Sequence, residues 1–240
     1  MNTIDIYALN LCDFTPQASA IDSAITRKAA TYKSAKKRQE YLASEWLRRF
    51  VLKRYVEDHD LVFDTTDKGR PFLKHNTCYD FNISHTKDWI VIAVAKGQKI
   101  GIDIQSSRET VDALGIAKQY YAKSEYQWLS TLPASKINYY FYLLWTLKEA
   151  SLKRTGEGIA FGLAHYAFIY KDKKLQLSDT VTTERPYYYS KNIESNIILS
   201  LAATDPIVNV RHFAIKNNSA LSAPVTLANI TNNNLIHHPE

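Results

Sequence analysis

Two stretches, Gly101-Ile102-Asp103-Ile104-Gln105 and Trp145-Thr146-Leu147-Lys148-Glu149-Ala150-Ser151-Leu152-Lys153, indicate the fold of this 240-residue chain. The first is typical of a short strand. Because strand side chains alternate between two faces, Asp103 and Gln105 should share one face and the isoleucines should enter the core from the other. The second stretch is typical of a helix, on which Trp145, Glu149 and Lys153 follow one another at intervals of four and share one face.

The polar residues of these two stretches suit a metal and a phosphate. An aspartate, an amide oxygen and a glutamate are hard oxygen ligands of the kind that Mg²⁺ takes, usually while keeping waters and contacting phosphates. Lys153, one turn after Glu149, could neutralise a phosphate oxygen. Taken singly, each stretch also has a plain structural interpretation: a hydrogen-bonded buried aspartate, or a solvated Glu–Lys pair worth about 0.3–0.5 kcal/mol.

Two further motifs favour the functional interpretation: Lys68-Gly69-Arg70-Pro71 and Phe81-Asn82-Ile83-Ser84-His85-Thr86. In chain order the four motifs resemble those of the Sfp-type 4′-phosphopantetheinyl transferases. That family has a Gly-Lys/Arg-Pro turn, Asn-Ile/Leu-Ser-His, Gly-Ile/Val-Asp-Ile/Val-Glu and Trp-x-x-Lys-Glu-(Ala/Ser)-x-x-Lys. The resemblance covers roughly half the chain, from about Lys36 to about Gly162. One position departs from the pattern, because Gln105 stands where the family has a second acidic ligand.

The resemblance implies an enzyme of the holo-[acyl-carrier-protein] synthase type. Such an enzyme moves the 4′-phosphopantetheine arm of coenzyme A to a serine hydroxyl of an apo acyl or peptidyl carrier protein. Adenosine 3′,5′-bisphosphate is released, and the expected cofactor is Mg²⁺ or Mn²⁺. The pathway, whether fatty-acid, polyketide or nonribosomal-peptide synthesis, stays open. Gln105 suggests the alternative of a catalytically silent member that binds coenzyme A or carrier proteins without transfer.

The resemblance also assigns roles to individual residues. Asp103, Gln105 and Glu149 are the expected metal ligands, Gln105 either directly or through a water. Glu149 is also the expected general base, directly or through a water, and Lys153 the second catalytic residue. The expected contacts to coenzyme A are Arg38, Arg70, Ser84, His85, Lys148 and Lys153.

Several of these contacts have structural alternatives. Lys148 is either a second cationic contact or a solvated side chain. Ser84 could cap a turn, and His85 could be a partly buried histidine with satisfied hydrogen bonds. Arg38 is one choice among the basic residues of 33–54, whose other members are expected on the solvated face of an amphipathic helix.

Interleaved strands and helices without a regular βαβ alternation predict the α+β class. The resemblance implies two pseudo-twofold-related lobes, each with a small antiparallel sheet packed on a long helix, and the active site in the cleft between them. The expected division is 1–105 for the coenzyme A-binding lobe, 106–215 for the lobe with the catalytic helix and carrier docking, and 216–240 for a loosely ordered tail. The turn at 96–99 predicts a hairpin between Trp89–Ala95 and Ile100–Gln105. The other expected strands are 3–9, 61–64, 81–84, 165–170, 174–177, 187–190, 196–203 and 208–215, and the expected helices 36–55, 110–119, 123–132 and 135–154.

Composition narrows the setting and the partners. A net charge of +6 favours acidic partners, which include carrier proteins. Nucleic acid is not expected, because no recognition module accompanies the charge. The two cysteines are too few for a disulfide framework or a zinc site and indicate a reducing, cytoplasmic setting. Neither a secretory signal nor a membrane span is expected. Two lobes in one chain lead us to expect a monomer.

Overall fold

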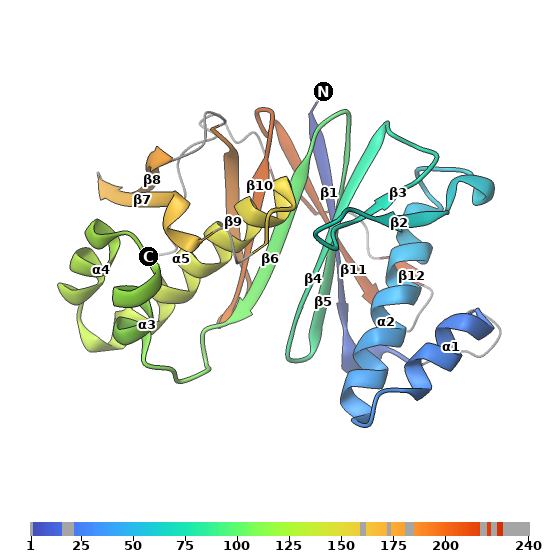
Figure 1. Ribbon diagram of the computed structural model, residues 1–240, viewed down its shortest axis with the longest axis horizontal. Helices are drawn as coiled ribbons and strands as arrows, with labels where there is room; N and C mark the ends of the chain where they lie inside the picture. The colour runs from blue at the N-terminus through green and yellow to red at the C-terminus, as the bar shows by residue number, and fades with distance from the viewer. Residues whose placement is uncertain are drawn as a thin grey trace.

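The chain forms two α+β lobes that lie side by side (Figure 1), which confirms the predicted class. The computed structural model describes residues 2–15, 22–158, 162–171, 174–180 and 185–216, together with two short strands at 220–221 and 225–227. Within these ranges, no helix combines the length and the apolar character needed to cross a bilayer.

The first lobe is a mixed sheet covered on one face by a long helix. The sheet has the order β12-β11-β1-β5-β4, with β13 also paired to β11. Ser34 caps α2 by accepting from the Lys37 N–H, and the apolar face of the helix packs Leu47 and Val51 against Phe81 and Ile92 of the sheet. The elements are β1 (Thr3–Asn10), η1 (Leu11–Asp13), α1 (Ser23–Ala30), α2 (Ala35–Leu52), η3 (Asp58–Asp60), β2 (Phe63–Thr65), β3 (Pro71–Leu73), β4 (Tyr79–Thr86), β5 (Trp89–Lys96), β11 (Asn209–Lys216), β12 (Ala220–Leu221) and β13 (Val225–Leu227).

The second lobe is a three-stranded antiparallel sheet, in the order β6-β10-β9, packed on the longest helix. This helix, α5, ends where Gly156 adopts a left-handed conformation (φ 77°), a common way for a helix to stop. The elements are β6 (Ile100–Ser106), α3 (Ala113–Tyr120), α4 (Lys123–Ser130), α5 (Ala134–Thr155), η5 (Leu163–His165), β7 (Tyr166–Lys171), β8 (Lys174–Thr180), β9 (Tyr187–Glu194) and β10 (Ile197–Ala203).

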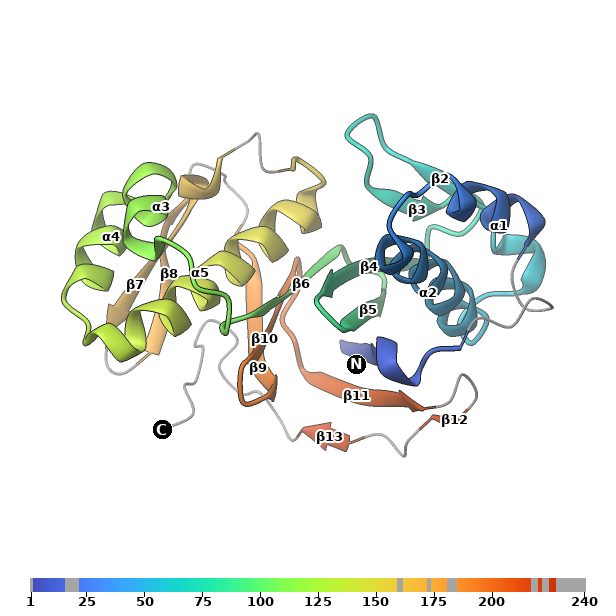
Figure 2. The ribbon, with the colours of Figure 1, turned by 90° about the horizontal axis from the view of Figure 1, so that it is seen from below.

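The two sheets lie side by side where the lobes meet (Figure 2). Their facing side chains form one core that joins the lobes. Ile4 and Ile6 of β1 contribute from one sheet, and Ile102 and Ile104 of β6 from the other. All four side chains are fully buried. The predicted alternation of β6 is therefore confirmed: its isoleucines enter the core between the sheets, and Asp103 lies on the opposite face.

The predicted hairpin of β5 with β6 is wrong. Strand β5 pairs with β1 and β4, and β6 pairs antiparallel with β10. The turn at 96–99 carries the chain from one sheet to the other instead of folding it back. At this crossing the side chains of Asp80 and Asn82, on β4, accept hydrogen bonds from the N–H groups of Ile100 and Ile102 at 2.8 and 2.9 Å.

The strand pairing also differs from the predicted division at residues 105 and 215. Strand β6, assigned to the first lobe, pairs in the second, and β11, assigned to the second lobe, pairs in parallel with β1. Arg211 supports this return by donating to both oxygens of Asp5, at 2.6 Å each. Within the predicted tail, β12 and β13 pair with β11, and the rest of 217–240 lies outside the described residues.

Candidate functional site

Helix α5 lies unusually close to β6, and Gly101 makes this approach possible. A Cβ at this position would sit 2.0 Å from the carbonyl oxygen of Ala150 and 2.4 Å from the backbone nitrogen of Arg154. No side chain fits there, so the helix backbone rests directly on the strand. The residue two positions later, Asp103, then lies against the face of α5 that carries Glu149 and Lys153.

A stripe of polar side chains on β4 faces β6. Asp80 and Asn82 bind the backbone of β6, as described above. Next along the stripe, the Ser84 hydroxyl donates to Asp103 Oδ1 at 2.8 Å. At the end, Thr86 Oγ1 lies 3.5 Å from Gln105 Oε1. The polar residues at every second position of β4 carried this signal in the sequence, but Asp80 and Asn82 were not among the predicted site residues.

Asp103, Glu149 and Lys153 lie together where α5 and β6 of the second lobe pack against β4 of the first, a junction that we call the cleft. Lys153 Nζ lies 2.6 Å from Asp103 Oδ1 and 2.9 Å from Ser84 Oγ. Asp103 and Glu149 are 2% and 7% exposed. Burial and, to a smaller extent, the charge of Asp103 raise the pKa of Glu149, Lys153 opposes both, and the result is a pKa of about 7. Two carboxylates thus share a nearly dry site in which one of them is close to gaining or losing a proton at neutral pH.

Each carboxylate also has an oxygen that is buried and unsatisfied. Asp103 Oδ2 and Glu149 Oε1 have no hydrogen-bond partner among the described residues. An unpaired buried carboxylate oxygen is costly unless a cation occupies the position beside it. Oxygen donors of this kind fit Mg²⁺ or Mn²⁺.

Gln105 shares the face of Asp103 and is half-buried, so its amide oxygen is available on the same side of β6. Within the described residues no three Asp, Glu, His or Cys side chains gather in a cluster. A cation held here would therefore rely on two carboxylates, with the Gln105 amide or waters completing its shell.

Ser84 and His85 were predicted as joint phosphate contacts, but they lie on opposite faces of β4. Ser84 faces Asp103, whereas His85 opens into a cavity of about 280 Å³ between β4, α2 and Tyr32, which follows α1. Lys37, Tyr41 and Ser44 also line this cavity. Because β4 is an edge strand, one ligand lying along its edge can touch both faces.

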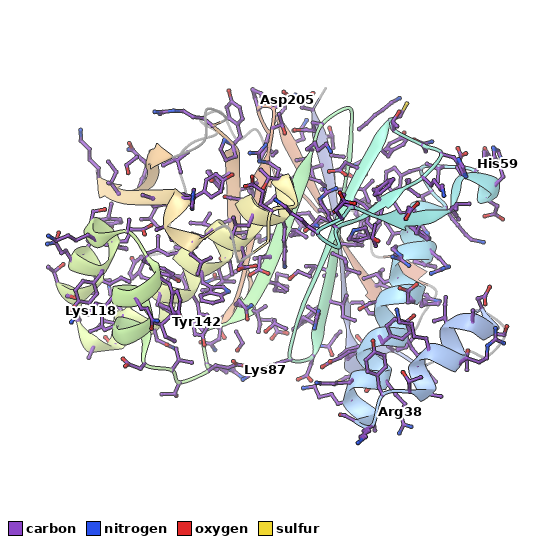
Figure 3. The ribbon with its side chains drawn as sticks, in the orientation of Figure 1. Arg38, His59, Lys87, Lys118, Tyr142 and Asp205 are labelled. Atoms are coloured by element: carbon purple, nitrogen blue, oxygen red, sulfur yellow. The ribbon has the colours of Figure 1, made fainter. Side chains whose placement is uncertain are left out.

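Arg38 does not line the cavity that holds His85. Its side chain is exposed at the foot of α2 (Figure 3). The neighbouring Lys37 lines the cavity instead. Adjacent side chains on a helix point about 100° apart, so only one of these two neighbours lines the cavity. The contact of Arg38 with coenzyme A stays a prediction.

Arg70 is held by neighbours within the protein. Its guanidinium donates to both oxygens of Asp80, at 3.1 and 2.7 Å, and to the carbonyl of Ile100 at 2.9 Å. Its Nε donates to the carbonyl of Lys153 at 2.8 Å. Arg70 therefore joins β4, β6 and the end of α5. Its contact to nucleotide phosphates stays a prediction.

Lys148 is neither a site residue nor a solvated one. It is fully buried and lies 2.8 Å from Glu125 Oε2 of α4. It also donates to the carbonyl oxygens of Leu163, at 3.0 Å, and Tyr166. Burial lowers the pKa of Lys148, and Glu125 opposes the shift. The ion pair ties α5 to α4 and to the start of β7, so both predicted alternatives for Lys148 are wrong.

Family models match most of the chain. The model described as "4'-phosphopantetheinyl transferase, N-terminal" matches residues 10–97, and the model described as "4'-phosphopantetheinyl transferase superfamily" matches residues 99–202. The boundary between the two matches falls at the turn where the chain crosses from β5 to β6.

Curated proteins similar to this chain have the same description. It is 35% identical over 130 residues to the 4′-phosphopantetheinyl transferase psf-1 of Bacillus pumilus, covering 54% of each chain. It is 32% identical over 148 residues to HetI of a Nostoc species, covering 60% of this chain and 62% of the relative. It is 26% identical over 162 residues to Sfp of Bacillus subtilis, covering 67% and 71%. The chain thus spans little more than half the length of the first two relatives.

Proposed function

The chain belongs to the 4′-phosphopantetheinyl transferase superfamily, with Sfp-type relatives, and from this premise we propose that it transfers the phosphopantetheine arm of coenzyme A to a serine hydroxyl of an apo acyl or peptidyl carrier protein. The observation that carries the proposal is the meeting of two buried, incompletely satisfied carboxylates, Asp103 and Glu149, with the ammonium of Lys153. The holo-[acyl-carrier-protein] synthase type, the monomeric state and the cytoplasmic setting belong to the same proposal.

Mg²⁺ or Mn²⁺ would be held by Asp103 and Glu149, with Gln105 as a neutral third ligand, directly or through a water. When bound, such a cation withdraws charge from the pyrophosphate oxygens of coenzyme A. The unpaired oxygens Asp103 Oδ2 and Glu149 Oε1 support this assignment, because a cation would satisfy both.

Lys153 and Ser84 would bind and orient the pyrophosphate beside those carboxylates. Lys153 offers an ammonium that is still 29% exposed while it bonds to Asp103, and Ser84 offers a hydroxyl. Phosphoryl transfer depends mainly on alignment and on neutralising charge, and these groups supply both.

Glu149 would act as the general base, directly or through a water. Its pKa of about 7 is that of a group able to accept a proton at neutral pH. The serine oxygen of the carrier attacks the phosphorus that bears the pantetheine arm and forms a new P–O bond. The P–O bond to the adenosine phosphate breaks, the bond's electron pair leaves with adenosine 3′,5′-bisphosphate, and the serine proton passes to Glu149.

The nucleotide end of coenzyme A would occupy the cavity of about 280 Å³ next to α2. Lys37 and His85 both line it and could bind the 3′-phosphate, while Tyr41 offers an aromatic face. His85 was predicted for this role and keeps it. Lys37 joins it in the proposal because it lines the cavity.

The proposal is tested by incubating the protein with coenzyme A, Mg²⁺ and several apo carrier proteins and weighing the intact carriers by mass spectrometry. A gain of one phosphopantetheine arm on any carrier, absent with Glu149→Ala, is the expected result. It would also identify the carrier class. If coenzyme A binds but no carrier gains mass, the alternative of a catalytically silent binding protein replaces the proposal.

A further inference from the structure

Asp80, at the beginning of β4, binds two other elements through one carboxylate. Its Oδ1 accepts from Arg70 Nη1 at 3.1 Å, and its Oδ2 accepts from Arg70 Nη2 at 2.7 Å and from the Ile100 N–H at 2.8 Å. The side chains of Arg70 and Asp80 are 7% and 17% exposed. A bidentate pair of this kind fixes the orientation of the guanidinium as well as its distance from the carboxylate.

Arg70 extends this anchor to the last turn of α5. Its Nε donates to the carbonyl of Lys153 at 2.8 Å, and its Nη2 donates to the carbonyl of Ile100 at 2.9 Å. The last four carbonyls of a helix have no partner within the helix, so a cation that binds one of them caps the helix and suits the negative end of its dipole. One guanidinium thus joins the start of β6 to the residue that bears the ammonium of the site.

The close approach of α5 to β6 does not by itself fix this last turn. At Gly101 the helix backbone rests on the strand near Ala150 and Arg154. Van der Waals contact of this kind sets the distance between helix and strand but has little directionality. Hydrogen bonds depend on angle as well as distance. The contacts of Arg70 therefore oppose a rotation or a slide of the last turn that the contact at Gly101 permits.

The position of the Lys153 ammonium depends on that turn. Lys153 Nζ lies 2.6 Å from Asp103 Oδ1 and 2.9 Å from Ser84 Oγ. A displacement of about 1 Å would take it beyond hydrogen-bond distance of both oxygens. Asp103 lies on the same strand as Ile100, whose N–H group Asp80 binds. The carboxylate of Asp80 therefore holds both partners of the Lys153–Asp103 ion pair relative to each other.

We propose that Asp80 is a positioning residue for the transfer reaction, which holds Lys153 against Asp103 through its contacts with Arg70 and Ile100. This inference rests on the proposed function. Both oxygens of Asp80 are bound within the protein, so the inference gives this residue no contact with coenzyme A or with the cation. Its effect should reach the reaction through Lys153.

A second aspartate of the chain provides a matched control. Asp5 binds Arg211 in the same bidentate manner, at 2.6 Å for each oxygen, and its side chain is 5% exposed. This pair joins β1 to β11 and has no member on α5 or β6. Asp5→Asn should therefore lower stability, as Asp80→Asn does, and leave the cleft unchanged.

A double-mutant cycle tests whether Asp80 acts through Lys153. At saturating coenzyme A and Mg²⁺, we expect Asp80→Asn to lower kcat for carrier modification about thirtyfold and Asp5→Asn to lower it less than about twofold. In a Lys153→Met background, Asp80→Asn should lower kcat less than about twofold further. Full losses in both backgrounds, or equal losses in Asp80→Asn and Asp5→Asn, would overturn the inference.

The labelling of Lys153 provides a readout that does not depend on transfer. Its side chain is 29% exposed, and its acetylation by acetic anhydride can be followed by peptide mass spectrometry relative to that of the exposed Lys123. Asp80→Asn should speed the acetylation of Lys153 about fivefold or more, because the ammonium leaves Asp103. Asp5→Asn should not change it. Equal rates in the wild type and in Asp80→Asn would overturn the inference.

The two measurements separate this inference from the proposed function. If the wild type modifies no carrier, the proposed function fails, and faster labelling in Asp80→Asn would still support the hold of Asp80 on Lys153. If Asp80→Asn transfers at the wild-type rate, the inference fails and the proposed function stands. If Asp80→Asn does not fold, Asp80→Glu takes its place in both measurements, because it keeps the charge and displaces the guanidinium by one methylene.

Discussion

Two lysines of α5, five residues apart, form two different ion pairs, and only one of the pairs is fully buried. Lys148 and Glu125 are both 0% exposed. Glu125 also accepts from the N–H groups of Ala122 and Phe168, at 2.8 and 2.9 Å. In the cleft, Lys153 is 29% exposed, and its partner Asp103 keeps one oxygen without a partner among the described residues.

The difference separates a structural pair from a functional one. We call Lys148–Glu125 the inner pair and Lys153–Asp103 the cleft pair. The protein satisfies the hydrogen bonds of the inner pair, so neither of its charged groups is left to bind a ligand. The cleft pair is incomplete, and Glu149 beside it is incomplete as well. Glu149 is buried, has an unsatisfied oxygen and has a raised pKa, and groups with these properties are typical of binding and catalytic sites. The α5 motif contains both lysines. They have different roles because they differ in their burial and in their hydrogen-bond partners.

The largest effect is expected at Glu149, the residue that most clearly belongs to the cleft. Glu149→Ala should lower carrier modification by about ten-thousandfold or more, equivalent to about 5.5 kcal/mol, because it removes both a base and a metal ligand. Intact-mass kinetics with saturating Mg²⁺ provide the measurement. Glu57→Ala, at an exposed position, is the control. Retention of more than a hundredth of wild-type activity by a folded Glu149→Ala protein would refute the assignment.

The second-largest effect is a loss of stability when the inner pair, Lys148–Glu125, is broken. Lys148→Met should lower the free energy of unfolding by about 3–5 kcal/mol, because it leaves the charge of Glu125 buried and unpaired. The double variant Glu125→Gln/Lys148→Met should recover a large part of that loss. Lys123→Met, at an exposed lysine of α4, should change stability by less than about 0.5 kcal/mol. Urea titrations measure all three, and additive losses in the double variant would count against a buried pair.

A third effect follows from the raised pKa of Glu149, about 7 against an ordinary 4.5. Between these values the folded protein binds a proton that the unfolded chain has released. Metal-free stability should therefore fall as pH rises from about 4.5 to 7, by about 3 kcal/mol in all. Relative to wild type, Glu149→Gln should gain stability across this window. Parallel stability curves for the two proteins from pH 5 to 8 would show that Glu149 titrates normally.

The smallest effect is expected at Gln105. A third carboxylate should bind the cation more tightly than an amide, so Gln105→Glu should lower the half-saturating Mg²⁺ concentration about tenfold, or about 1.4 kcal/mol. The measurement is a Mg²⁺ titration of carrier modification. Wild-type saturation as tight as that of the variant would mean that Gln105 is not near the metal.

Local sequence patterns predicted the residues of the cleft and missed the ion pair between Lys148 and Glu125. The alternation of β6 and the four-residue spacing of α5 fixed which side chains share a face, so Asp103, Glu149 and Lys153 were predicted together. Lys148 points about 100° away from Glu149, and only the packing of α4 and β7 decides whether that direction is solvent or core. Nothing local to Glu125 or Lys148 carries that information.

Strand pairing between distant residues was missed for the same reason. Strand β11 joins β1 through contacts such as Arg211 with Asp5, which are 206 positions apart in the chain. The turn at 96–99 has the length of a hairpin turn, which is why a hairpin was predicted. The chain instead passes to the second sheet, where Asp80 and Asn82 bind the backbone of β6. Arg70 was likewise placed by its local motif, while its partners lie on three separate elements.

The most direct test of the account is the binding of Mn²⁺ to the protein with coenzyme A present, measured by electron paramagnetic resonance. We predict one tightly bound ion per chain, lost in Asp103→Asn and in Glu149→Gln and retained in the double variant Glu125→Gln/Lys148→Met. Unchanged Mn²⁺ binding in folded Asp103→Asn would contradict the claim that the cleft pair, and not the inner pair, is the open site.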